Sequence, residues 1–324
     1  SVISMPDKVM SIKYLTNSIP ADDKDEYICY MAGNDEIYVD QNQNVVRINS
    51  KDNGIIEVIP GENFSEEKLT GYDINNIQNT PSNISSLKTN LLTKMTIYLC
   101  MEKGLINVDY LKNSSLRQSF SGTINDKKIE GEVTIVRDAV QPQNPLAFPV
   151  MVEWKPELQK YLGCSQKIEA DNPEIVFKAK QITKDTDNIW DAARAIAVWT
   201  YKNIKPEYAG DLNALDTLKM GKGECGPISL LTAALCRSIN IPAKVITGYV
   251  YVDDFNAFAL HYWVEVYTGN TGWKSIDPAL GQFNFLDPSH IGLSDEFCTL
   301  NFSSMKPVII KILNYEPYEA GSSQ

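Results

Sequence analysis

Histidine is scarce in this chain, which has only two among its 324 residues. Any mechanism that needs an imidazole therefore has two candidates, His261 and His290. The six cysteines are dispersed along the chain and form neither a CxxC pair nor a cluster with the spacing of metal ligands. These absences argue against a structural zinc site and against a disulfide framework. We expect no metal and no cofactor, with calcium as an open alternative, although the acidic clusters ADDKDE and VDD lack a recognisable ligand loop.

Positive charge and long apolar runs are also in short supply. Lys and Arg number 30 against 41 Asp and Glu, which gives a formal net charge of −11. This charge repels phosphate backbones and anionic membrane surfaces, so no nucleic-acid partner is expected. No apolar run approaches the ~20 residues of a membrane-spanning helix, so we expect no integral membrane segment. The oligomeric state stays open.

The cellular compartment stays open as well. The first residues, SVISMPDK, carry no charged-then-apolar signal segment, but they also lack an initiator Met. A cell-envelope or extracellular location would follow if a leader had been removed, and a cytoplasmic location is also compatible with the sequence.

The pattern of the chain changes near residue 150. Before that point, turn-forming segments separate short strand-like stretches such as EIYVD, KMTIYLC and KIEGEVTIV, and the last of these closes a predicted hairpin with a bulge at Gly131. The stretch QPQNPLAFP, residues 141–149, contains three prolines and is the predicted linker. We therefore expect a β-rich domain of unassigned role over residues 1–145 and a second domain over residues 150–324.

The second part of the chain has helical periodicity followed by strands. Apolar residues recur at helical spacing in NPEIVFKAKQITK and in TDNIWDAARAIAVWTYKNI, and a third apolar helix is predicted after Cys225. The stretches AKVITGYVYV and ALHYWVEVY are typical of strands, and Gly269 to Gly272 supply a hairpin turn. The predicted class is α+β.

Cys225 stands between glycines where this third helix is predicted to begin, in GKGECGPISLLTAALC. Pro227 suits a first helical turn, where a missing N–H has no cost. The exposed backbone N–H groups and the positive end of the helix dipole at such a position favour a thiolate. A packed thiol at a helix start is the alternative for Cys225. Cys236, further along the same helix, is predicted to be a core residue.

His261 and Asp277 are predicted to approach each other across the hairpin. Alternate residues of a strand share a face, so Asp277 lies opposite His261, or one same-face position along, if paired residue numbers sum to 538 or 540. Such neighbours are separated by about 4.5 to 8 Å, close enough for a carboxylate to orient an imidazole. A nucleophile at a helix start with a base and an orienting group on a sheet is the arrangement of thiol enzymes.

The stretches GKGECGPISLLTAALCRSINIPAKVITGYV, HYWVEVY and GWKSIDPALG resemble the transglutaminase-like superfamily of papain-type cysteine enzymes, in its bacterial or archaeal form. The resemblance covers roughly residues 165–295. It implies a core in which a nucleophile-bearing helix packs on an antiparallel sheet, with Cys225 as nucleophile, His261 as base and acid, and Asp277 as orienting group. DPSHIGLSDEF also resembles a C-terminal stretch of the family, so His290 is expected to be structural.

Thiol-dependent hydrolysis or acyl transfer at a peptide or protein amide, through a thioester, is the function that this set of residues predicts. The Cys225 N–H is the expected oxyanion donor, and Tyr208 is a candidate for further support. One alternative is a catalytically idle fold that binds proteins or peptides. A redox-sensing thiol is another alternative, but it needs a resolving cysteine, and nothing in the sequence places Cys236 in that role.

Overall fold

The computed structural model describes the chain as two compact units, residues 1–77 with 300–306 and residues 78–299 with 307–324. Within the first unit the description covers the backbone of five strands. Within the second it covers residues 80–103, 106, 108–113, 117–138, 141–253, 256–295 and 308–317. In the described part of the chain, no helix combines the length and the apolar character that a membrane crossing requires.

The first unit contains a five-stranded antiparallel sheet in which strands adjacent in sequence pair with each other. The strands are β1 (Lys13–Thr16), β2 (Ile28–Ala32), β3 (Asp35–Val39), β4 (Val45–Ser50) and β5 (Gly54–Glu57). The stretch EIYVD, which is typical of a strand in the sequence, coincides with β3.

The second unit is built on two antiparallel sheets. The central sheet has the order β14-β13-β12-β15, with β6 also paired to β13, and the other has the order β16-β7-β9-β8. The central strands are β6 (Thr80–Pro81), β12 (Ala243–Val252), β13 (Ala257–Tyr267), β14 (Trp273–Ile276) and β15 (Ile291–Ser294). The other sheet comprises β7 (Leu92–Glu102), β8 (Gln118–Ile124), β9 (Lys128–Val136) and β16 (Ile309–Pro317).

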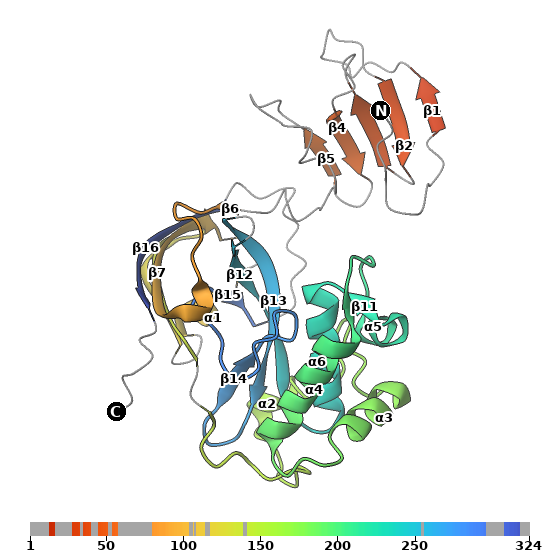
Figure 1. Cartoon of the computed structure of the whole chain (residues 1–324), viewed down its shortest axis with the longest axis vertical. Helices are drawn as coiled ribbons and strands as arrows, with labels where there is room; N and C mark the ends of the chain where they lie inside the picture. Colours follow the sequence, from red (N-terminus) through yellow and green to blue (C-terminus); the bar gives the residue numbers. More distant parts are fainter. Residues whose placement is uncertain are drawn as a thin grey trace. The chain divides into compact units, whose positions relative to one another are not determined.

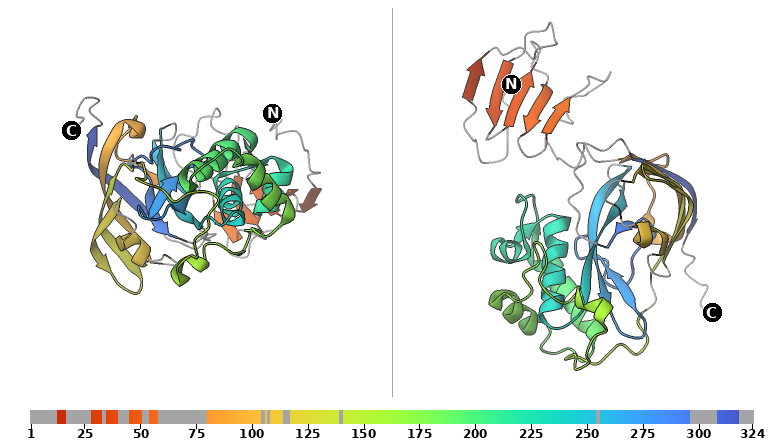
Figure 2. Two further views of the ribbon diagram at one scale, coloured as in Figure 1. Left: turned by 90° about the horizontal axis from the view of Figure 1, so that it is seen from below. Right: turned by 180° about the vertical axis from the view of Figure 1, so that it is seen from behind.

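Helices cover one face of the central sheet, and the second sheet lies across its other face with α1 (Val108–Asn113) between them (Figure 1; Figure 2). The covering helices are α2 (Pro156–Gln159), α3 (Pro173–Ile182), α4 (Ile189–Asn203), α5 (Ala214–Met220) and α6 (Cys225–Ser238). Along β13, Tyr262 and Val264 join the core formed with these helices, whereas Trp263 packs with Tyr110 of α1 on the opposite face. Successive side chains of a strand point to opposite faces, so alternate residues of β13 face the helices and the others face the second sheet.

Local sequence explains where these helices begin. The Asn side chain at the N-cap of α3, α4 and α5 accepts a hydrogen bond from a first-turn backbone N–H in each case. Gly221 ends α5 in the left-handed region at φ 64°, a conformation that glycine adopts without steric cost. A short parallel pair, β10 (Lys205–Pro206) with β11 (Lys222–Gly223), then leads the chain into α6.

The segment 141–149, predicted as the linker, lies within the second compact unit. The Leu146 carbonyl accepts from Ile189 N at 2.9 Å, Phe148 N donates to Asp187 O at 2.9 Å, and both apolar side chains pack on the helical core. The boundary between the compact units lies near residue 77, since the sheet formed by β7, β8, β9 and β16 belongs to the same unit as the central sheet. The division into residues 1–145 and 150–324 stays a prediction about which parts fold independently.

Gly131 is not a bulge. It pairs with Gly122 in a regular register between β8 and β9. A Cβ at Gly131 would lie 2.4 Å from the Ser121 carbonyl oxygen, so close approach of two strands accounts for this glycine.

Candidate active site

Cys225 is the first residue of α6, as the sequence predicted. The N-cap residue Glu224 makes no side-chain capping bond, which leaves the first-turn N–H groups of this helix for another acceptor. Gly223 permits the tight entry into the helix, because a Cβ there would lie 2.8 Å from the Pro227 Cβ. The thiol is half-buried, whereas Cys236, further along the same helix, is fully buried.

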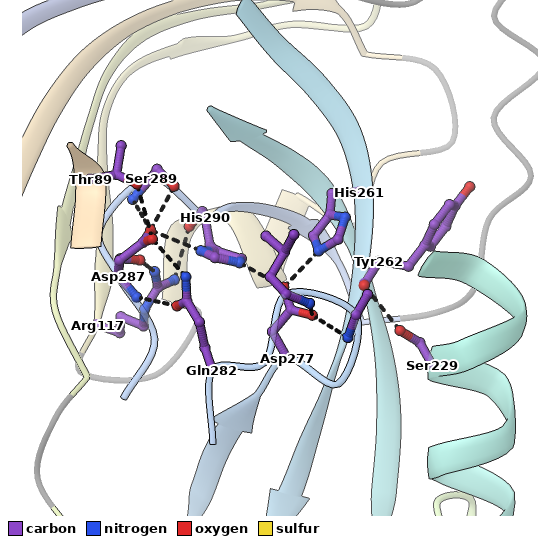
Figure 3. A network of polar contacts seen from close by, with 12 residues as sticks. Thr89, Arg117, Ser229, His261, Tyr262, Asp277, Gln282, Asp287, Ser289 and His290 are labelled. Atoms are coloured by element: carbon purple, nitrogen blue, oxygen red, sulfur yellow. Dashed lines mark hydrogen bonds and ion pairs between the residues drawn. The ribbon is translucent and has the colours of Figure 1, made fainter. Parts of the chain in front are cut away.

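His261 and Asp277 meet through the predicted hairpin. The register pairs Val264 with Ile276, a sum of 540, which puts Asp277 one same-face position along from His261. The His261 Nε2 atom lies 2.7 Å from Asp277 Oδ2, and both side chains are buried (Figure 3). The carboxylate therefore fixes the orientation of the imidazole and leaves Nδ1 for another partner.

Cys225 also acts on His261: a hydrogen bond from its thiol and the charge of its thiolate are among the causes that raise the pKa of the imidazole. A second contact ties helix to strand at the same level, since Ser229 Oγ donates to the Tyr262 carbonyl at 3.0 Å (Figure 3). Burial opposes a charge on His261, but the charge and hydrogen bond of Asp277, followed by those of Cys225, raise its pKa to about 10. The ring thus favours the imidazolium form that pairs with a thiolate.

Asp277 is held by four donors. Oδ1 accepts from the backbone N–H groups of Ala279 at 2.8 Å and Leu280 at 2.9 Å. Oδ2 accepts from His261 at 2.7 Å and from His290 Nε2 at 3.0 Å. Burial would raise the pKa of this carboxyl, but the charges and hydrogen bonds of His261 and then His290 hold it well below its usual range.

The contact of His290 with Asp277 was not predicted from the sequence, in which His290 is expected to be structural. Its other ring nitrogen, Nδ1, lies 3.0 Å from Asp287 Oδ1. Sequence reasoning missed Asp287 altogether, although a signal was present: a second Asp-Pro step, Asp287-Pro288, follows Asp277-Pro278 and is separated from His290 only by Ser289. Asp277 and His290 are 13 residues apart in sequence, and the pairing of β15 with β12 brings them together.

The three groups His261, Asp277 and His290 could also be considered as metal ligands. One ligand atom from each lies within 4.8 Å of the others, and all three side chains are buried. In the described structure Asp277 Oδ2 serves both imidazoles as an acceptor, which accounts for the convergence without an ion. That no metal or cofactor is required stays a prediction.

Tyr208 lies on the segment that runs beside the start of α6. Pro206 pairs with Gly223, and Glu207 N donates to Gly223 O at 3.4 Å, so the chain leaves this short pair two residues before Tyr208 and two before Cys225. The Tyr208 side chain is 62% exposed. The backbone register therefore places the segment that leads to Tyr208 beside the segment that leads to Cys225.

The thiols are expected to differ sharply in reactivity. Burial raises the pKa of Cys236 to about 12, and a hydrogen bond to Asp171, followed by partial burial, raises the pKa of the exposed Cys164. Cys225 has the uncapped helix end and His261 to stabilise its thiolate. Iodoacetamide near neutral pH should therefore modify Cys225 first, as read by peptide mapping. Equal rates at Cys225 and Cys164 would contradict this expectation.

Acid should destabilise the protein through Asp277 and Asp287. Burial opposes ionisation of Asp287, but the charge and hydrogen bond of His290 outweigh it and hold the pKa of this carboxyl well below its usual range. Because the unfolded value is about 3.9, both carboxylates contribute stability above about pH 4 that is lost as pH falls further. Urea midpoints measured between pH 6 and pH 3 should decline.

Two variants separate this effect from the general charge of the protein. Asp287→Asn should start from a lower urea midpoint and decline less steeply toward acid. Asp185→Asn, at a side chain that is 84% exposed, should follow the wild-type slope. An unchanged slope in Asp287→Asn would refute the assignment of the acid sensitivity to this carboxylate.

Comparison with known proteins agrees with the geometry. Residues 177–278 match the family model of the transglutaminase-like superfamily. An uncharacterized protein of Haemophilus influenzae is 28% identical over 120 residues, which are 35% of this chain and 31% of that protein. The uncharacterized protein YebA of Bacillus subtilis is 29% identical over 141 residues, which are 36% of this chain and 18% of that protein. The matched part is thus less than a third of the length of either relative.

Solved structures also resemble the chain. A protein from Cytophaga hutchinsonii covers 70% of this chain and 94% of its own length, with 17% identity and a TM-score of 0.49. The periplasmic domain of TgpA from Pseudomonas aeruginosa covers 47% of this chain and 54% of its own length, with 18% identity and a TM-score of 0.32. The sequence match includes the helix that begins at Cys225, the strand that carries His261 and the hairpin that ends at Asp277. Over residues 177–278 the chain is therefore similar to the transglutaminase-like superfamily.

Proposed function

We propose that this protein is a thiol-dependent enzyme that hydrolyses a peptide or protein amide or transfers its acyl group. Cys225 is the nucleophile, His261 the base and acid, and Asp277 the orienting group. One observation carries the proposal: a half-buried thiol at an uncapped helix start shares a hydrogen bond with an imidazole whose other nitrogen lies 2.7 Å from a buried carboxylate.

The reaction follows from the protonation states that this geometry favours. The Cys225 thiolate attacks the amide carbonyl carbon, and the carbonyl oxygen becomes an oxyanion. When the C–N bond breaks, the His261 imidazolium gives its proton to the departing amine, and an acyl thioester remains on Cys225. Water, or a second amine, then loses a proton to His261 as it attacks the thioester. The acyl group leaves as a carboxylic acid or as a new amide.

Two donors are proposed for the oxyanion. The Cys225 backbone N–H lies at the start of α6, where the helix dipole favours negative charge. The Tyr208 hydroxyl is the second, because its segment follows β10 as Cys225 follows β11. Because the Tyr208 side chain is exposed, it can move over a bound amide without leaving a cavity in the core.

Removal of the Tyr208 hydroxyl tests the second donor. Tyr208→Phe should lower kcat by roughly 10²-fold, the loss typical of one oxyanion donor, with little change in KM. Tyr201→Phe is the matched control, since Tyr201 is also an exposed tyrosine, at 49%, on the helical layer. Equal kcat values for the two variants would remove Tyr208 from the mechanism.

The proposal as a whole is tested by trapping the thioester. Wild-type protein is incubated with a library of glutamine-containing and other peptides, quenched in acid, and the peptide that carries Cys225 is analysed by mass spectrometry. Hydroxylamine converts an acyl-enzyme to a hydroxamate, and free acid without hydroxylamine reports hydrolysis. If wild type yields neither, and Cys225→Ala binds a natural partner with unchanged affinity, the fold is a binding module rather than an enzyme.

A further inference from the structure

His290 lies between two carboxylates. Its Nε2 atom is 3.0 Å from Asp277 Oδ2, its Nδ1 atom is 3.0 Å from Asp287 Oδ1, and the ring is fully buried (Figure 3). The pKa of each carboxyl is lowered, with burial opposed chiefly by the neighbouring histidines, so both are ionised. An ionised carboxylate only accepts hydrogen bonds. Both ring nitrogens of His290 therefore face acceptors, and only a doubly protonated ring can donate to both.

Asp287 is itself held rigidly. Oδ1 accepts from Ser289 N at 2.9 Å and from Ser289 Oγ at 2.6 Å, in addition to His290. Oδ2 accepts from Gln282 Nε2 at 2.7 Å and from Thr89 Oγ1 at 3.1 Å. Five hydrogen-bond donors converge on the buried Asp287 carboxylate. These bonds hold the carboxylate in place, and its contact with Nδ1 in turn holds the ring of His290.

The charges alternate along this line of contacts. Behind Asp287, the Arg117 guanidinium donates to the carbonyls of His290 and Asp287, although burial lowers its pKa. With a doubly protonated His290, the order from the back of the site forward is Arg117 positive, Asp287 negative, His290 positive, Asp277 negative. The His261 imidazolium and the Cys225 thiolate of the proposed function would complete a neutral line, which is the condition under which buried charges are tolerated.

We propose that His290 and Asp287 form a second imidazole–carboxylate pair that positions Asp277 for its contact with His261. This inference rests on the proposed function for the roles of Asp277 and His261. His290 never touches the substrate in this scheme; it fixes the acceptor oxygen that orients the catalytic imidazole. Its charge, on a ring whose centroid is 5.7 Å from that of His261, also lowers the proton affinity of the groups in front of it.

Nuclear magnetic resonance tests the charge directly in the unmodified protein. The chain has only two histidines, so a ¹⁵N-labelled sample shows just two imidazole rings, and His290→Gln identifies each. At pH 7 the His290 ring should show hydrogens on both nitrogens, protected from exchange by burial. A ring with one unprotonated nitrogen would overturn the proposal. The measurement needs no substrate, and it needs the folded variant only to assign the signals.

A pair of matched variants tests the positioning role. His290→Gln keeps a neutral donor near Asp277 but removes the charge. Lys244→Gln likewise removes a buried cation between two carboxylates, Glu265 at 3.1 Å and Asp295 at 3.9 Å, in the same sheet but outside the line. Because loss of a positive charge makes nearby groups hold protons more tightly, His290→Gln should shift the pH profile of Cys225 alkylation upward by about one pH unit.

Kinetics complete the comparison. His290→Gln should lower kcat by about 10- to 100-fold with KM nearly constant, the range seen when an outer partner of a functional imidazole is lost. Lys244→Gln should change neither the alkylation profile nor kcat. If both variants shift alike, or neither shifts, His290 has a structural role only and the inference fails while turnover stands. If the ring is doubly protonated and the profile shifts but no substrate is turned over, the proposed function fails instead.

Discussion

Replacement of Cys225 by alanine is expected to lower turnover by about 10⁶-fold, the size of loss seen when a catalytic nucleophile is removed. The thiol is half-buried and starts a helix, so its removal opens no core cavity and the melting temperature should change by only a few degrees. Serine at this position should be almost as inactive, because a hydroxyl does not ionise beside His261 as a thiol does. The measurement is kcat/KM with the substrate found by thioester trapping.

Cys236 offers the matched control on the same helix. Cys236→Ala removes a fully buried thiol, so it should lower the melting temperature through a small cavity and leave kcat/KM unchanged. The opposite pattern, in which Cys225→Ala retains turnover, would mean that the nucleophile is another group. A loss of activity in both variants that tracks their stability would point to unfolding rather than chemistry.

Local periodicity and turn chemistry were sufficient to predict most of the site. The apolar repeats give α3, α4 and α6, and a turn at Gly269 to Gly272 sets the register that brings Asp277 to His261. Both depend on residues close together in sequence. Because side chains of a strand alternate between two faces, the sequence left one question open: whether paired residue numbers in this hairpin have an even sum. The structure answers it with a sum of 540.

The contacts that the sequence did not predict are those between distant segments. His290 and Asp287 join the site only because β15 pairs with β12, and Arg117 and Thr89 reach them from segments more than 170 positions away. The segment 141–149 looked like a linker because it has prolines and no periodicity. Its hydrogen bonds join it to the start of α4 and to Thr268, contacts between distant segments that no local pattern encodes.

Asp277→Asn is expected to lower turnover by up to about 10⁴-fold and also to destabilise the fold. An amide in place of the carboxylate must direct NH₂ either at the two backbone N–H groups of Ala279 and Leu280 or at the two imidazoles. In the first case two backbone donors lose their acceptor. In the second, His261 loses the partner that selects its tautomer. Either loss occurs at a site with no solvent exposure to compensate it.

The destabilisation distinguishes this structure from a simple triad, in which an orienting carboxylate can be neutralised with little effect on folding. A buried donor left without its acceptor costs about 1–3 kcal/mol, so the urea midpoint of Asp277→Asn should fall measurably at pH 7. Asp295→Asn is the matched control, because Asp295 accepts a 2.7 Å hydrogen bond from Tyr161 outside the site and should lose stability without losing turnover. A stable and inactive Asp277→Asn would show that Asp277 only orients His261. An unstable and active one would show that it only supports the fold.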